Sequence, residues 1–136
     1  MQKSLRIPDD IVRAIEDLAE ISGQDFSAVA NELLAEAMKM RRCPGIIFAD
    51  GPTGRRARVA STGLEVWEVI ATYQSVERDR GRLQQAYSRL SEGQLRAALG
   101  YYAAYPEEID RHRAANERWT KERLFAQHPS LAVNRS

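Results

Sequence analysis

Residues 3–38, KSLRIPDDIVRAIEDLAEISGQDFSAVANELLAEAM, decide the fold of the N-terminal part of this 136-residue chain. Polar and apolar side chains alternate at its start, which is the period of a half-buried strand. Leu5 and Ile7 would lie on one face of this strand. The polar side chains Gln2, Ser4 and Arg6 would lie on the opposite face. Pro8 is expected to end the strand and to suit the first position of a helix.

Two amphipathic helices are predicted after this strand. Residues 9–22 begin with two aspartates, which favour a helix N-terminus, and Gly23 is typical of a left-handed C-terminal cap. Asp25 is expected to cap a second helix that ends near residue 42, before Pro44-Gly45 breaks the chain. The apolar stripes of the two helices comprise Ile11, Ile15, Leu18, Ala19, Ile21, Val29, Ala30, Leu33, Leu34, Ala37 and Met38.

A unit of one strand and two short helices has too little apolar surface to bury on its own. The strand lacks a pairing partner, and the helices cannot enclose a core of stable size. We therefore expect a homodimer in which two strands pair antiparallel and four helices share one core. The exposed face of the paired strands would then carry Gln2, Ser4 and Arg6 from both chains.

The pattern in residues 3–38 resembles the ribbon-helix-helix family. The resemblance implies a two-stranded ribbon that lies in the DNA major groove and contacts base edges through Gln2, Ser4 and Arg6. It also implies that a DNA phosphate is held by amides at the start of the second helix, around Asp25, Phe26 and Ser27. Many members carry Ser or Thr where this chain has Asp25. The alternative is a dimerisation unit that makes no DNA contact.

Residues 43–106 predict a β-hairpin followed by a helix-turn-helix. Gly45 to Pro52 is expected to form a strand that enters a tight turn, and Arg55 to Ala60 the returning strand. A helix of about 12 residues is expected from Leu64 and a shorter one from Arg82 to Arg89. Ser91 to Gln94 matches a capping box that opens a third helix. The side chains expected to face inward are Leu64, Val66, Trp67, Val69, Ile70, Tyr73, Leu83, Ala86, Tyr87, Leu90, Leu95, Ala98, Leu99 and Tyr102.

This second segment resembles the bacterial domain of unknown function numbered 433. The match lies in CPGIIFADGPTGRRARVASTGLEVWEVIATY, residues 43–73, and in LSEGQLRAALGYYAAYPEEID, residues 90–110. The resemblance implies a helix-turn-helix-like domain that serves as the antitoxin component encoded beside a nuclease-like toxin. The residues expected to contact DNA here are Arg55, Arg56, Arg58 and Arg96.

Residues 107–136 form a segment that differs from the preceding ones in apolar content and in charge. Acidic residues at its start favour a helix, but large apolar side chains are sparse, so we expect it to gain order by docking on a partner. Residues 111–136 hold six basic side chains against two acidic ones. This mixture suits the acidic cleft of a PIN-like or other metal-dependent nuclease. The predicted toxin-binding residues are Arg118, Trp119, Lys121, Arg123, Leu124 and Phe125. The alternative is that the segment wraps back onto the second domain.

Composition and missing motifs argue against an enzyme, a membrane protein and a secreted protein. No signal peptide or apolar span is evident, so we expect a cytoplasmic protein. Cys43 is the single cysteine, which excludes an internal disulfide or a CxxC metal site. His112 and His128 are the two histidines, and no Gly-rich phosphate loop or Gly-x-Ser-x-Gly elbow accompanies them. We expect no catalysis, cofactor or metal.

The chain is thus predicted to be mainly α-helical with short β elements, in segments 1–42, 43–106 and 107–136. The predicted function is the antitoxin of a type II toxin–antitoxin pair. It would neutralise a nuclease-like toxin and repress its own operon by binding DNA as a dimer. Two other binding functions stay open. One is a stand-alone transcriptional regulator whose tail serves oligomerisation, and the other is an adaptor in which neither module touches DNA.

Overall fold

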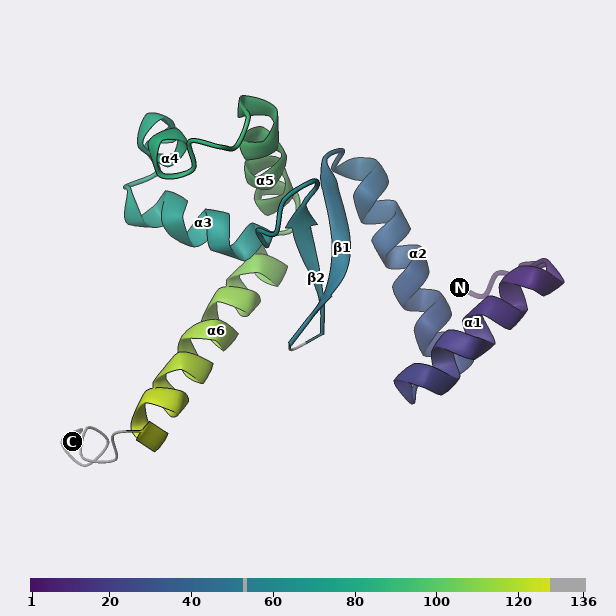
Figure 1. The fold of residues 1–136 in the computed structure, drawn as a ribbon. Helices are drawn as coiled ribbons and strands as arrows, with labels where there is room; N and C mark the ends of the chain where they lie inside the picture. The colour runs from purple at the N-terminus through teal and green to yellow at the C-terminus, as the bar shows by residue number, and fades with distance from the viewer. Residues whose placement is uncertain (53, 128–136) are drawn as a thin grey trace. The chain divides into compact units, whose positions relative to one another are not determined.

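The structure, a computed structural model, describes residues 1–52 and 54–127 (Figure 1). Within these residues it has six helices and one two-stranded antiparallel hairpin, which confirms the mainly α class with short β elements. Two compact units divide the chain, Met1–Arg42 and a second unit that begins at Cys43. In chain order the elements are α1 Asp9–Ser22, α2 Phe26–Arg42, β1 Ile46–Gly51, β2 Gly54–Val59, α3 Val66–Ser75, α4 Arg80–Ala86, α5 Glu92–Ala104 and α6 Pro106–Gln127.

In the first unit, α1 and α2 pack against each other and are ended by the residues that the sequence indicates. Pro8 is the N-cap of α1, one position before the predicted one, and its carbonyl accepts from the amides of Ile11 and Val12. Gly23 has a φ of 71° and closes the helix in the left-handed conformation, as predicted. The Asp25 carboxylate accepts the Ala28 amide at 2.8 Å, which confirms the predicted cap of α2.

Residues 1–8 have no regular secondary structure in this single chain. A strand there would need a second chain to pair with, so the ribbon stays a prediction. The apolar side chains of the unit are largely uncovered, and Ile15 and Val29 are the buried ones among its residues 1–42. Its exposed large apolar side chains are Met1, Leu5, Ile11, Leu18, Ile21, Leu33, Leu34, Met38 and Met40.

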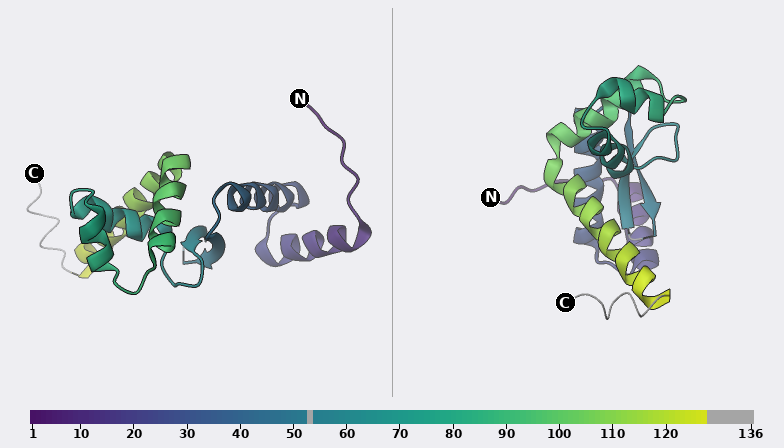
Figure 2. Two further views of the ribbon diagram at one scale, coloured as in Figure 1. Left: turned by 90° about the horizontal axis from the view of Figure 1, so that it is seen from above. Right: turned by 90° about the vertical axis from the view of Figure 1, so that its left-hand side faces the viewer.

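In the second unit, the hairpin and α3, α5 and α6 enclose a core of their own (Figure 2). The hairpin pairs Ile46 with Val59 and Phe48 with Ala57, and these residues face the helices. Arg56 and Arg58 alternate with them on β2, as the period of a strand requires. The buried side chains of the unit are Cys43, Ile46, Ala57, Val59, Val66, Val69, Ile70, Leu83, Leu90, Leu95, Ala98, Tyr101 and Ile109.

Two helices in this unit have other bounds than predicted: α3 begins at Val66 and not at Leu64, and α4 is shifted because its cap, Asp79, was overlooked. The helix expected over residues 82–89 is α4, which begins at Arg80 because the Asp79 carboxylate accepts the Arg82 amide at 2.9 Å. It ends earlier than expected, and Ala86, predicted to face inward, is exposed. The capping box at the start of α5 is confirmed, because Ser91 Oγ accepts from the Gln94 amide and Gln94 Oε1 accepts from the Ser91 amide.

The first turns of helix α6 pack on the rest of the second unit, and its last turns extend away from it (Figure 1). Ile109 is fully buried beside Tyr101, so the first turns pack back onto the unit, as the alternative interpretation of this segment had it. Beyond residue 116 most side chains of the helix are exposed. Residues 128–136, the end of the predicted toxin-binding segment, lie outside the described part of the chain.

Candidate functional site

The residues predicted to contact bases are exposed but are not brought together by a single chain. Gln2, Ser4 and Arg6 lie in the segment that has no regular structure. At the start of α2, the Asp25 carboxylate already occupies the amide of Ala28. A second anion at this helix end would meet the negative charge of Asp25. The phosphate site around Asp25, Phe26 and Ser27 stays a prediction.

Of the four arginines predicted to contact DNA in the second unit, Arg55, Arg56 and Arg58 lie on β2 and Arg96 lies on α5. Arg55 donates to the Asp50 carboxylate at 3.4 Å and to the Phe48 carbonyl at 3.3 Å, along the hairpin. Arg58 is half-buried, and its Nε has no hydrogen-bond partner within the described residues. Arg96 forms an exposed pair with Glu92 on α5.

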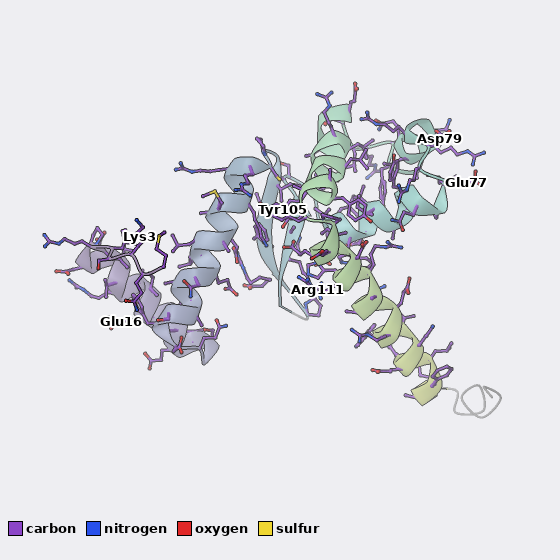
Figure 3. All side chains as sticks on the ribbon, turned by 180° about the vertical axis from the view of Figure 1, so that it is seen from behind. Lys3, Glu16, Glu77, Asp79, Tyr105 and Arg111 are labelled. Atoms are coloured by element: carbon purple, nitrogen blue, oxygen red, sulfur yellow. The ribbon has the colours of Figure 1, made fainter. Side chains whose placement is uncertain are left out.

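Helices α4 and α5 have the predicted helix-turn-helix order, but α5 is poorly equipped to contact bases. A recognition helix needs long side chains with hydrogen-bonding ends on its outer face. The exposed positions of α5 are mostly small, namely Glu92, Gly93, Arg96, Gly100, Ala103 and Ala104. Figure 3 shows Glu77 and Asp79 at the corner between α3 and α4, where they place acidic groups among the arginines of that corner.

The predicted toxin-binding residues do lie together, on the outer turns of α6. Trp119 is 52% exposed and Leu124 43% exposed, although both are large apolar side chains. The Arg123 guanidinium lies 5.1 Å from the centroid of the Trp119 ring, a cation–π contact one helical turn apart. Arg118 and Lys121 are exposed, whereas Phe125 is half-buried. This part of α6 is a mixed basic and aromatic surface.

Trp119 also borders a pocket that the sequence analysis missed. The pocket has a volume of about 280 Å³ and lies between α6, the hairpin turn and the start of α3. Four of its residues recur on α6 at positions i, i+3, i+4 and i+7, so they share one face of the helix. The lining residues are Pro52, Arg56, Glu65, Trp67, His112, Ala115, Asn116 and Trp119.

Two polar contacts set the chemistry of this pocket. The indole Nε1 of Trp67 donates to the Glu65 carboxylate at 3.0 Å, which fixes the ring and occupies one carboxylate oxygen. Burial, and then the positive charge of Arg56, lower the pKa of His112 below its ordinary value. His112 is therefore neutral at pH 7 and can both donate and accept a hydrogen bond.

A tyrosine pair anchors the start of α6 beside this pocket. The Tyr101 hydroxyl donates to the Glu108 carboxylate, and burial together with this bond raises the pKa of Tyr101. The Tyr102 hydroxyl donates to Asp110 at 2.9 Å, and this carboxylate also pairs with Arg113 at 3.6 Å. Helix α6 is thus held through its first two turns by hydrogen bonds as well as by Ile109.

None of the helices formed by residues 1–52 and 54–127 has an apolar stretch long enough to cross a bilayer. The same residues contain no group of three or more His, Cys, Asp or Glu side chains placed to hold a metal ion.

The chain matches no protein-family model and no curated protein. Among solved structures it is similar to the crystal structure of a DUF433 member protein from Anabaena variabilis. The two sequences are 25% identical, and the alignment covers 79% of this chain and 99% of that one with a TM-score of 0.45.

Proposed function

We propose that this protein is the cytoplasmic antitoxin of a type II toxin–antitoxin pair, which represses its own operon as a DNA-bound homodimer. The observation that carries the proposal is that uncovered large apolar side chains, apart from Ile47 on β1, gather in two separate places. One place is the first unit, and the other is the outer part of α6. Two such places support two interfaces, one with a second copy of the chain and one with a different protein.

The first unit supports the self-interface. Leu18 and Ile21 on α1 and Leu34 and Met38 on α2 are between 46% and 84% exposed, at the spacing of core positions. Water contact with this much apolar surface opposes folding of two helices alone. A second copy would cover it and would also give residues 1–8 a strand to pair with. The paired strands would present Gln2, Ser4 and Arg6 to the DNA.

The outer part of α6 supports the toxin interface. Its exposed aromatic residue and its arginines are the residue types that dominate the binding energy of protein interfaces. Arg118, Lys121 and Arg123 would pair with acidic groups of a PIN-like or other metal-dependent nuclease, and Trp119 would contribute an anchor.

A truncation tests the toxin interface. Deleting everything after residue 106 would remove Ile109 from the core, so the sharper variant ends at residue 116, which keeps the buried part of α6 and removes the exposed Trp119. Co-expressed with the neighbouring toxin, this variant should fail to protect cells while still binding its operator. Survival equal to that with the full-length chain would exclude the outer turns as the neutralising element and favour the stand-alone regulator.

A gel-shift series tests the DNA interface. Arg6→Ala should cost roughly 1–3 kcal/mol in operator binding and relax sequence preference, because a base contact is lost. Arg13→Ala is the matched control, since Arg13 is an exposed arginine on α1 outside the predicted ribbon. If the two variants bind the operator with equal affinity, the ribbon serves only as a dimer interface and makes no base contacts.

A further inference from the structure

The pocket beside Trp119 is small. Its volume of about 280 Å³ lies below the range typical of sites for drug-sized ligands. Both tryptophans of the chain line it, Trp67 from α3 and Trp119 from α6. Indole rings on two sides favour a flat, apolar guest that stacks or packs edge to face.

The polar groups of the pocket favour a guest with a single hydrogen-bonding end. Glu65 is engaged by the Trp67 indole at 3.0 Å. His112 and Asn116, one helical turn apart on α6, make no side-chain hydrogen bond within the described residues and line the pocket. A neutral imidazole and an amide can each accept one N–H or O–H from a guest.

We propose that this pocket receives one aromatic side chain of the protein partner, a tyrosine or a tryptophan, packed against Trp67 and Trp119. Its hydroxyl or N–H would bond to the side-chain amide of Asn116, next to His112 on the same face of α6. This inference rests on the proposed function, because it assumes a protein bound along α6. It adds that the antitoxin provides a pocket for a partner side chain as well as the exposed Trp119 that binds the partner.

A partner side chain fits better than a nucleobase. Arg56 is the one cationic side chain in the described lining, whereas nucleotide sites usually add several donors for the phosphate. The pocket is also continuous with the proposed toxin interface, because Trp119 borders the pocket and is 52% exposed on the outer surface. A partner that covers Trp119 would therefore reach the pocket mouth.

The two tryptophans provide a direct test by nuclear magnetic resonance. Each gives one indole N–H resonance in the ¹⁵N-labelled full chain. p-Cresol, the tyrosine side-chain analogue, should shift both resonances with a Kd of about millimolar order, as expected for so small a ligand. Toluene, which lacks the hydroxyl, should bind severalfold more weakly. If neither probe shifts the resonances, or if AMP does so at a lower concentration than p-cresol, the proposal is overturned.

A pair of helix substitutions connects the pocket to the partner. Ala115→Phe fills the pocket with its own ring, and Ala114→Phe makes the same change at an exposed neighbouring position. Ala115→Phe should abolish the p-cresol shifts and weaken toxin binding at least about tenfold. Ala114→Phe should leave both unchanged.

Unchanged toxin affinity in the Ala115→Phe chain would overturn the proposed pocket occupant, whereas full protection of cells by the chain truncated after residue 116 would overturn the proposed function itself. Asn116→Ala covers the case in which Ala115→Phe does not fold, because Asn116 is exposed and its loss spares the core. This variant should bring the Kd of p-cresol close to that of toluene. A Kd for p-cresol that stays at the wild-type value would remove Asn116 from the site and contradict the proposed hydrogen bond.

Discussion

The two units of this chain use the same kind of helix and differ in whether one chain completes the core. Helices α1 and α2 are well capped, yet Ile15 and Val29 are the apolar side chains of that unit that are buried. In the second unit, side chains such as Ile70, Leu83 and Tyr101 are fully buried between the hairpin and several helices. Capping decides where a helix begins and ends, whereas burial supplies most of its stability. We therefore expect the first unit to depend on a partner for its stability and the second unit to be stable without one.

Breaking the proposed dimer of the first unit has the largest expected effect. Leu5→Glu would place a carboxylate in the predicted shared core without a partner, which costs several kcal/mol. We expect the variant to be monomeric at micromolar concentration and α1 and α2 to lose most of their helicity. Sedimentation and circular dichroism measure both changes.

Gln2→Glu is the control for Leu5→Glu. It adds a carboxylate to the same segment, on the face predicted to stay exposed, and should leave the dimer intact. A wild-type chain that sediments as a well-folded monomer would refute the comparison between the units.

A core substitution in the second unit should act without regard to protein concentration. Ile70→Ala removes buried methyl groups from a fully enclosed side chain, so the free energy of unfolding should fall by about 2–5 kcal/mol. Leu124→Ala removes a similar side chain that is 43% exposed and should change stability by less than about 0.5 kcal/mol. Chemical denaturation at two protein concentrations checks the pair. Equal losses would mean that the outer part of α6 is packed as tightly as the core.

Much of this fold is predictable from sequence because its signals are local. Gly23, Asp25 and the Ser91–Gln94 box mark helix ends through their own hydrogen bonds, and all of them are confirmed. The errors arose where a cap was overlooked. Asp79 begins α4 earlier than its apolar spacing suggested, and Ala86, the last residue of this helix, is exposed.

The pocket could not be predicted in the same way, because its residues come from distant parts of the sequence. Trp67 stands at the helical spacing of a core residue, and His112 belongs to no recognisable motif in the sequence around it. The packing of α6 against α3 brings them together. The spacing of His112, Ala115, Asn116 and Trp119 was the available signal, but a stripe of mixed polarity does not distinguish a pocket wall from a solvated face.

The capping box of α5 offers a test of intermediate size. Ser91→Ala removes the hydroxyl that accepts the Gln94 amide at 3.1 Å, and we expect a loss of about 1 kcal/mol in unfolding free energy. Ser88→Ala, an exposed serine in the turn before the helix, is the matched control and should be close to neutral. If both variants melt at the wild-type temperature, the reciprocal bonds of the box add nothing beyond the packing of α5.

The smallest expected effect is the pH dependence of the second unit. Burial and Arg56 lower the pKa of folded His112 below its ordinary 6.5, so below that pH the unfolded chain binds more protons than the folded one. The stabilising contribution is therefore complete above pH 6.5 and is lost as the pH falls through the lower folded pKa. His112→Gln should melt with a shallower loss of stability between pH 7 and pH 5 than the wild type, by a small margin because the imidazole is partly exposed. His128→Gln, which alters the other histidine, should keep the wild-type slope. An unchanged slope in His112→Gln would show that the imidazole is not held neutral, and would remove it as a hydrogen-bond acceptor in the pocket.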